Sequence, residues 1–233
     1  MTIGVDRAFV DLHCHTRASF DCLSSPAAVA RLAAERGLTH LAITDHHRLD
    51  GALEARAAAP LGLTVIVGEE IRTTAGDLIA LFIERPIPPG LSAVEAIDAV
   101  REQGGLVGIP HPFDRFRGSL GHDAAIASLA PLVDWVETHN ARLVGRGNER
   151  AVELALDNGL PGVAVSDAHT LLEVGVAYTV LQGDPSTPAG LLGALSGGQI
   201  VPGRASFVAR LVTPAARVVQ RLRGNGRMPP EIR

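Results

Sequence analysis

Residues 8–15 read Ala-Phe-Val-Asp-Leu-His-Cys-His, a short apolar run that leads directly into two histidines. Such a run, rich in Val and Leu, is typical of a buried strand, here Ala8–Leu12. Side chains alternate along a strand, so His13 and His15 lie on one side, as two ligands of a metal ion require, and Cys14 faces the other side. The segment predicts a strand whose carboxyl end carries metal chemistry.

The same pattern of a short apolar run recurs along the chain, with helical patterns in between. The further expected strands are His40–Thr44, Leu63–Val67, Leu78–Ile83, Leu106–Ile109, Trp135–Thr138 and Gly162–Val165. One helix begins at Ser25-Pro26 and ends at Gly37, and Ser92 and Glu95 form an S-x-x-E capping box for another. A third helix covers Asn148–Asp157. Strand and helix alternate, which predicts an α/β fold, either a barrel or a doubly wound sheet with a mainly parallel arrangement.

The composition limits the chemistry that the chain can perform. All 21 basic residues among the 233 are arginine, which excludes Schiff-base lysine chemistry and the lysine of a phosphate-binding P-loop. The net charge is −4, yet residues 204–233 carry seven arginines and a single acid, Glu231. The remaining body is therefore acidic, which favours cation binding over stable nucleic-acid binding.

Cysteine usage and hydropathy indicate the compartment. Cys14 and Cys22 do not form a disulfide framework, and the N-terminus lacks the pattern of a signal peptide. No apolar run approaches the ~20 residues that a membrane helix needs. We expect a cytoplasmic protein that does not associate with membranes.

Histidines and carboxylates of the type that bind metals follow almost every expected strand. In α/β barrels the carboxyl ends of the strands form the functional face. The candidate metal ligands are His13, His15, Asp21, His46, Glu70, His111, Asp167 and His169. Asp167 and His169 repeat the two-residue spacing of the first pair. Asp77 could be a further ligand or a turn cap, whereas His40, His122 and Cys22 are expected to be structural.

Other polar residues near the strand ends are candidates for contact with a substrate. Arg115, Arg117 and Arg142 follow expected strands, and a guanidinium group matches phosphate oxygens in a bidentate manner. His47 and His139 either support the ligands or contact the substrate, where they could protonate a departing alkoxide.

The ordered motifs D-L-H-C-H, Asp21, I-T-D-H, G-E-E, G-G-L-V-G-I-P-H-P, V-E-T-H-N-A-R and S-D-A-H-T, within residues 9–170, resemble the polymerase and histidinol phosphatase (PHP) family. The resemblance implies a distorted seven-stranded (βα) barrel, TIM-like and in a single domain. It also implies phosphoesterase activity at a site for three ions, usually zinc, manganese or iron. We expect this barrel over residues 1–203, followed by an Arg-rich helix and tail over residues 204–233.

The resemblance also assigns the ligands to individual ions. The implied first ion is bound by His13, His15, Glu70 and Asp167, the second by Glu70 and His111, and the third by Asp21, His46 and His169. Many relatives have a further histidine ligand of the second ion in the strand after the glutamate, where this chain has the run Gly76–Phe82 with Asp77. The expected cofactor is therefore two or three divalent ions of Zn, Mn or Fe.

These features lead to three hypotheses about function. The first is a phosphoesterase that hydrolyses a small phosphorylated metabolite or nucleotide by a metal-bound hydroxide. The alternative is a metal-dependent hydrolase of carboxyl esters, carbamates or amides on the same site. The third is a non-catalytic module of the kind that accompanies DNA polymerases. A requirement for arginine discriminates between the two enzymes, because only a phosphate ester carries charge to the site.

Overall fold

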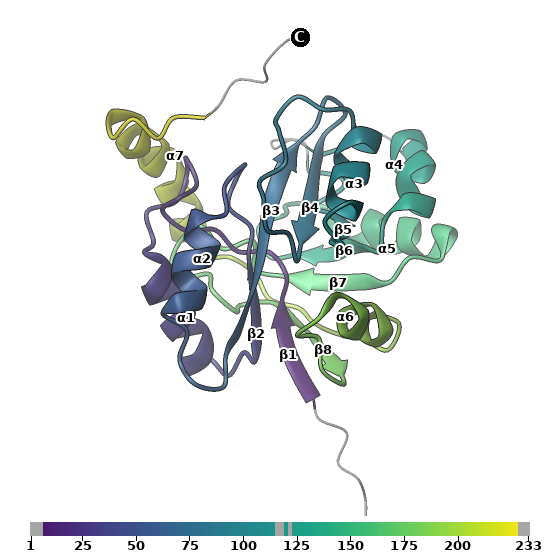
Figure 1. Ribbon diagram of the computed structural model, residues 1–233, viewed down its shortest axis with the longest axis horizontal. Coiled ribbons are helices and arrows are strands. Elements are labelled where there is room, and N and C mark those ends of the chain that lie inside the picture. The colour runs from purple at the N-terminus through teal and green to yellow at the C-terminus, as the bar shows by residue number, and fades with distance from the viewer. Residues whose placement is uncertain (1–6, 115–118, 121–122, 228–233) are drawn as a thin grey trace, which may run out of the picture.

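The computed structural model describes residues 7–114, 119–120 and 123–227, and within these residues nine strands form one sheet (Figure 1). The strands are β1 Arg7–Asp11, β2 His40–Ile43, β3 Thr64–Arg72, β4 Asp77–Leu81, β5 Leu106–Ile109, β6 Trp135–Asn140, β7 Gly162–Val165, β8 Tyr178–Gln182 and β9 Gln199–Val201. Their order in the sheet is β7-β6-β5-β4-β3-β2-β1-β8-β9. All seven expected strands form, and the α/β prediction is confirmed.

Helices connect most of these strands. They are α1 Pro26–Glu35, α2 Asp50–Ala57, α3 Ala93–Arg101, α4 Asp123–Leu129, α5 Gly147–Asn158, α6 Pro188–Leu195 and α7 Phe207–Leu222, with a 3₁₀ turn at Ala130–Leu132. The Ser25 side chain caps α1 by accepting the Ala28 N–H at 3.2 Å. Ser92 and Glu95 form the capping box of α3 that the S-x-x-E motif predicts. Local sequence signals therefore determine where these two helices begin.

Strand β7, at one end of the sheet, meets the segment after β1 and strand β8, and this junction makes a nearly closed barrel. Beyond β7, Asp167 donates its N–H to the carbonyl of His13 at 2.9 Å, and His15 donates its N–H to Ala168, also at 2.9 Å. Further from the carboxyl end of β7, the Thr179 hydroxyl of β8 accepts the Ala164 N–H of β7 at 2.8 Å. We call this junction the seam. The distorted barrel is thus closed next to the motif from which the fold was predicted.

Strand β4 runs antiparallel to both of its neighbours, although a mainly parallel sheet was expected. Strand β3 continues beyond Val67 to Arg72, because Glu70 pairs with Ile79 of β4. The sequence pattern placed Gly68-Glu69-Glu70 after a strand. In the structure this segment lies inside β3. Alternation separates the two glutamates, and the Glu69 carboxylate accepts the Ile87 N–H at 3.0 Å, away from the other ligands.

An apolar cluster fills the barrel and closes one end of it. It contains residues of every strand from β1 to β8 together with Leu191 and Leu195 of α6. Ala8, Leu106 and Trp135 in this cluster lie near the starts of their strands, so α6 covers the end opposite to the carboxyl ends of the parallel strands. The carboxyl end is left for polar side chains.

The structure also bears on the expectation about membranes. None of the helices in the described ranges combines the length and the apolar character that crossing a membrane requires.

Candidate metal centre

His13 and His15 stand at the carboxyl end of β1 with fully buried side chains. Their Nε2 atoms are 3.0 Å apart, so the two rings converge on one point as their spacing predicts. Cys14 between them packs into the apolar cluster outside the barrel. The alternation of a strand thus separates the polar pair from the thiol.

Glu137 of β6 holds the ring of His13 in place. Its Oε1 lies 2.6 Å from Nδ1 of His13, and its Oε2 accepts the backbone N–H of His111 and the side-chain amide of Asn140, each at 2.8 Å. Asn140 also donates to Oδ2 of Asp167 at 3.0 Å. Burial disfavours protonation of His13, but the carboxylates of Asp167 and Glu137 outweigh it and raise its pKa well above the usual value.

Glu70 lies at the centre of the cluster, where it faces four imidazole rings from three segments. Its Oε1 is 3.1 Å from Nε2 of His111, and its Oε2 is 3.3 Å from Nε2 of His15, 3.3 Å from Nδ1 of His46 and 3.4 Å from Nε2 of His13. Burial alone would raise the pKa of Glu70, yet His46 and the other imidazoles hold it well below its usual value. The single carboxylate of Glu70 therefore lies next to all four of these imidazole rings.

Asp21, His46 and His169 form the outer part of the cluster. Oδ1 of Asp21 is 3.5 Å from Nε2 of His169 and 3.7 Å from Nε2 of His46. This oxygen is buried and accepts no hydrogen bond from any residue that the structure describes. Glu173 anchors His169 by accepting its backbone N–H at 3.1 Å. The three side chains come from different loops of the chain and meet next to the His13 and His15 pair.

Two candidate ligands adopt backbone conformations that L-residues rarely adopt. The φ angle is 27° at His111 and 51° at Asp167. Positive φ values carry an energetic cost of order 1–3 kcal/mol in a residue other than glycine and cluster at functional sites. The Glu137 carboxylate and the His13 carbonyl, which accept the backbone N–H groups of these two residues, hold the strained turns in place.

Asp77, the first residue of β4, completes a third group with Glu70 and His111. The ligand atoms of these three buried side chains lie within 4.8 Å of one another. Arg72 forms an ion pair with Asp77 at 2.7 Å. Burial and the neighbouring Glu70 carboxylate raise the pKa of Asp77 to about 6. A carboxylate thus stands in the segment where many relatives place a histidine.

The chemistry of this donor set fits divalent metal ions. Two ligands that bind one tetrahedral ion at ~2.0–2.2 Å lie roughly 3.3–3.6 Å from each other. The imidazole–carboxylate distances of Glu70 and Asp21 fall between 3.1 and 3.7 Å. The buried Asp21 Oδ1, which has no hydrogen-bond donor within the described ranges, is an oxygen that a cation would satisfy. The residues present therefore fit the expected ions.

A cavity of about 220 Å³ opens above the cluster. It is lined by Phe20, Asp21, His46, Glu70, Arg72, Asp77, His111, His169, Arg217 and Arg227. A second cavity of about 530 Å³ shares Phe20, His46, Arg72 and Arg227 with it, and His47 and Arg48 line its other side. The first cavity contacts the candidate ligands, and the second extends the site outwards.

The structure places the expected substrate residues differently from the ligands. Arg142 forms a buried ion pair with Glu173 at 2.8 Å and donates to Thr213 at 2.8 Å, so it does not line either cavity. His139 contacts the Gly203 carbonyl at 2.7 Å and is also absent from both linings. Arg115, Arg117 and His122 lie outside the described residues, as do the last six residues of the chain.

His47 is the expected substrate residue that the structure brings to the site, at the second cavity. Its Nε2 accepts the Arg72 N–H at 3.3 Å, which places its proton on Nδ1. Burial, together with the charge of His46, lowers the pKa of His47 to about 4. The imidazole is therefore neutral at pH 7.

Several residues at the site were not predicted from the sequence. Glu137 stands two residues before His139 in the same strand, so the alternation that singled out His13 and His15 could have found it. Arg72, Arg217 and Arg227 had no such signal, because no local pattern connects them to the strand ends.

Comparisons with known proteins find a matching family. A family model described as PHP domain matches residues 11–120, and one described as PHP-associated matches residues 139–200. All eight candidate ligands fall inside these two ranges. An uncharacterized protein of Methanocaldococcus jannaschii is 36% identical over 142 residues, which are 56% of this chain and 81% of that one.

Two solved structures share the fold. A two-domain protein from Bacteroides vulgatus that contains a predicted PHP-like metal-dependent phosphoesterase matches with a TM-score of 0.70 and 20% identity, over 86% of this chain and 66% of that one. A lesion-specific endonuclease from Pyrococcus furiosus matches with a TM-score of 0.65 and 18% identity, over 84% of this chain and 58% of that one. At these identities the likeness concerns the fold.

Proposed function

The chain belongs to the PHP family of metal-dependent hydrolases, and from this premise we propose that it hydrolyses the phosphate ester of a small phosphorylated metabolite or nucleotide.

The proposed ligands are eight side chains, five of which line the cavity of about 220 Å³ while His13, His15 and Asp167 are buried next to them. The eight are His13, His15, Asp21, His46, Glu70, His111, Asp167 and His169, in the three groups described above. Bound Zn, Mn or Fe ions would polarise the ester and lower the pKa of a water molecule towards neutrality. Asp77 stands with Glu70 and His111, the ligands of the implied second ion, so three ions are proposed and two are the minimum.

The observation that carries the phosphoesterase assignment is the charge of the cavity wall. Arg72, Arg217 and Arg227 line the same cavity of about 220 Å³ as the candidate ligands. Bound cations and guanidinium groups would both attract an anion, and a phosphate monoester carries nearly two negative charges. A neutral carboxyl ester would gain little from the arginines. The wall therefore favours phosphorus over carbonyl carbon.

The chain's own residues orient the site for this chemistry. Glu137 fixes the tautomer of His13 that leaves Nε2 directed at Glu70. Protonation of the departing alkoxide by His47 or His139 stays a prediction, and of these two residues His47 lines the second cavity.

A substrate panel tests the proposal. The purified protein is assayed with phosphate monoesters, phosphodiesters, single-stranded oligonucleotides and carboxyl esters, with zinc, manganese and iron supplied in turn. We expect phosphate monoesters to be hydrolysed with the highest kcat/KM. Preferred hydrolysis of neutral esters would replace the proposal with the carbonyl-hydrolase alternative, and preferred cleavage of oligonucleotides would replace the small substrate by a nucleic acid.

A further inference from the structure

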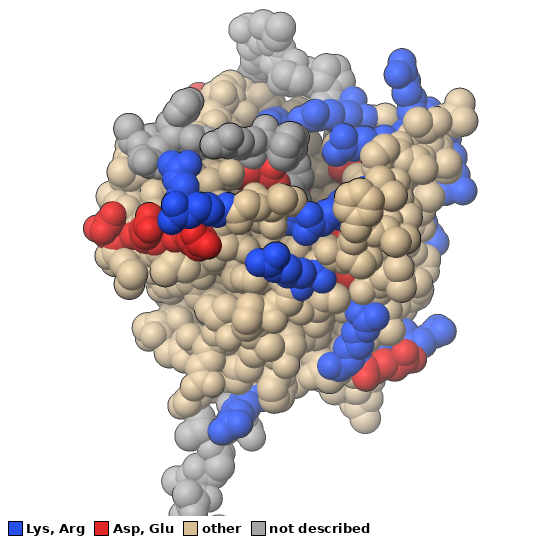
Figure 2. All heavy atoms as spheres, turned by 180° about the vertical axis from the view of Figure 1, so that it is seen from behind, with Lys and Arg blue, Asp and Glu red and all other residues tan. Residues whose placement is uncertain are grey.

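The segment 204–227, here called the C-terminal arm, lies beyond both family matches, the second of which ends at residue 200. It consists of α7 and the residues that follow it, and it contains arginines but no acidic residue. Figure 1 shows α7 at the end of the barrel towards which β1 and β3 point. Figure 2 shows blue side chains gathered at the upper right, where α7 lies in that view, with little red among them.

Buried hydrogen bonds fasten the C-terminal arm to the loop that carries Asp21. The Gln220 amide, which is 2% exposed, donates to the carbonyls of Ser19 at 2.9 Å and Cys22 at 2.7 Å. Asn225 donates to the Ala18 carbonyl at 3.0 Å. A buried amide with several carbonyl partners fixes a helix in one position, because each lost bond would leave a polar group unsatisfied. The arm is thus a fixed wall of the site.

Two arginines of the C-terminal arm point at the metal cavity. The guanidinium carbon of Arg217 is 5.7 Å from the centroid of the Phe20 ring, and that of Arg227 is 5.6 Å from it. Nη2 of Arg217 also lies 3.4 Å from Oδ2 of Asp21, on the other side of the carboxylate from the histidines. Phe20 therefore holds both cations beside the candidate ligands through cation–π contacts.

The arginines of the wall differ in how firmly they are engaged. Arg72 is paired with Asp77 at 2.7 Å. Arg227 forms no ion pair with a carboxylate in the part of the chain that the structure describes, and it lines both cavities. A planar guanidinium in this position can bind two oxygens of a phosphate group while the rest of the molecule extends past it.

We propose that Arg217 and Arg227 bind the phosphate group of the substrate, and that the second cavity takes its organic part. The proposal rests on the proposed phosphoesterase function and deepens it. A volume of about 530 Å³ is within the ~300–1,000 Å³ of ordinary ligand pockets, whereas the metal cavity of about 220 Å³ is below it. The substrate class is a phosphate monoester with an organic group large enough to use the second cavity.

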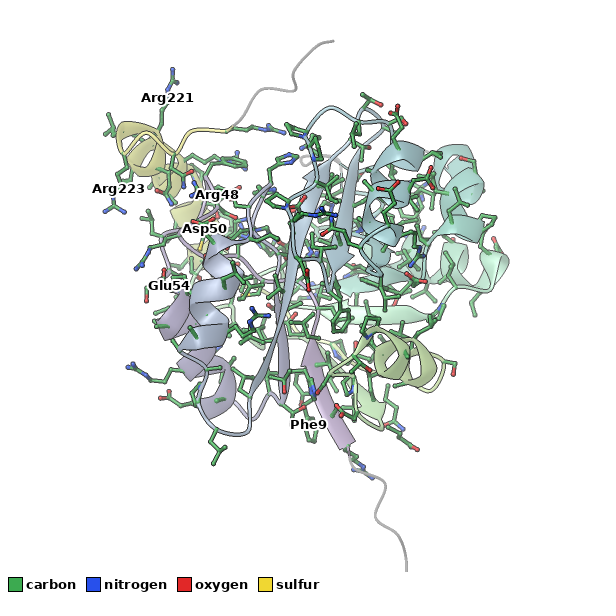
Figure 3. All side chains as sticks on the ribbon, viewed as in Figure 1. Phe9, Arg48, Asp50, Glu54, Arg221 and Arg223 are labelled. Atoms are coloured by element: carbon green, nitrogen blue, oxygen red, sulfur yellow. The ribbon has the colours of Figure 1, made fainter. Side chains whose placement is uncertain are left out.

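The C-terminal arm also supplies a matched control. Arg221 follows Arg217 by one helical turn, and Figure 3 shows it pointing away from the barrel. It lines neither of the two cavities. Arg221→Ala therefore removes the same charge from the same helix without removing a group from the wall.

Steady-state kinetics with a phosphate monoester form the first test. We expect Arg217→Ala and Arg227→Ala each to raise KM at least tenfold, with a smaller loss in kcat. Arg217→Lys should recover only part of this loss, because an ammonium group cannot bind two oxygens in the guanidinium geometry. Arg221→Ala should stay within twofold of the parent. An equal effect of all three alanine variants would mean that net charge, and not the wall, attracts the substrate.

Calorimetric binding of inorganic phosphate, together with the metal content of each variant, forms the second test. We expect Arg217→Ala and Arg227→Ala to bind phosphate at least tenfold more weakly with an unchanged metal content. If both bind phosphate within twofold of the parent, the proposal is overturned. It is also overturned if Arg217→Ala loses metal while Arg227→Ala behaves as the parent, since the arm would then only support Asp21.

The two proposals fail in distinguishable ways. If the parent hydrolyses no phosphate ester, the proposed function fails, and the phosphate-binding measurements still decide the role of the arm. If the parent hydrolyses phosphate esters and the arginine variants match it in both tests, the proposed function stands and the C-terminal arm does not bind the phosphate group.

Discussion

The Glu137 carboxylate lies 2.6 Å from Nδ1 of His13 and thereby directs the opposite nitrogen of the ring at Glu70. Partners of this kind typically contribute 10–100-fold to metal affinity. We expect Glu137→Gln to weaken metal binding by about this factor, as measured by competition with a chelator. Glu149→Gln is the control, because Glu149 lies on the surface in an exposed ion pair with Arg146. Equal affinities in the two variants would show that Glu137 does not orient a ligand.

The number of candidate ligands predicts the metal content. Seven of the eight candidates stand in three groups together with Asp77, and Asp21 lies 3.5 Å from His169, so the set exceeds what one tetrahedral or octahedral ion can accept. We expect at least two transition-metal ions per chain by elemental analysis of the purified protein. Less than one ion per chain, with no activation by added metal, is the result that contradicts this prediction.

His13 and Asp167 face each other across the seam, and each should be essential for hydrolysis. We expect His13→Ala and Asp167→Ala to lower kcat/KM by far more than tenfold, a factor that corresponds to ~1.4 kcal/mol. The barrel should stay folded, because the ligands decorate its mouth and not its packed interior. Circular dichroism checks the fold. If a variant keeps more than a tenth of the parent kcat/KM, the substituted residue is not a ligand of a catalytic metal ion.

Arg142 is expected to matter for stability more than for substrate binding. Its side chain pairs with both oxygens of the buried Glu173, at 2.8 and 3.0 Å. Removing one partner of a buried pair typically costs ~3–5 kcal/mol, because the other charge is left uncompensated. Arg142→Ala should therefore lower Tm by roughly 10 °C in thermal unfolding. Arg146→Ala, which breaks an exposed pair, should change Tm by little, and similar Tm values for both would contradict the prediction.

His40 gives a prediction about pH, away from the metal cluster. Burial lowers the pKa of His40 below 6.5, against the opposing effect of the Asp184 carboxylate. A depressed pKa in a base means that the fold favours the neutral ring. Its contribution to stability is thus present above pH 6.5 and is lost as the pH falls through the lower folded pKa.

The measurement compares the parent with His40→Gln, which cannot be protonated. Between pH 8 and pH 5 the Tm of the parent should fall further than that of the variant, by about 2 °C. The Nε2 atom of His40 lies 3.0 Å from the Ser186 hydroxyl, and glutamine can keep a polar contact there. A parallel decline of the two proteins would show that His40 does not titrate across this range.

Much of the site could be predicted from the sequence because it is encoded locally. A strand followed by His13 and His15, or by Asp167 and His169, fixes both the burial of the strand and the direction of the ligands. Strand alternation alone thus predicts that four side chains meet at the barrel mouth, where the structure places them. Capping signals such as that of Ser92 have the same local character.

The rest depends on contacts between distant segments. The antiparallel direction of β4 follows from the pairing of Glu70 with Ile79, which no short pattern announces. Arg217 meets Asp21 only because Gln220 bonds to carbonyls of the loop around Ser19, and neither residue type indicates this partner. The arginines of the site were therefore looked for in the loops after strands, whereas Arg72 ends β3 and Arg217 and Arg227 come from the C-terminal arm.

Because some candidate ligands lie at the seam, a bound metal ion would also stabilise the closure of the barrel. His15 follows β1 and Asp167 follows β7, the strand at one end of the sheet, with Nε2 and Oδ1 3.5 Å apart, and near the mouth a few backbone hydrogen bonds join the two segments. An ion that both residues bind would hold β7 to β1 across the seam. Loading it should slow the amide hydrogen exchange of β7 and postpone unfolding on heating. A chelator would then loosen the barrel along one line and leave the packing around α1 and α3 as it was.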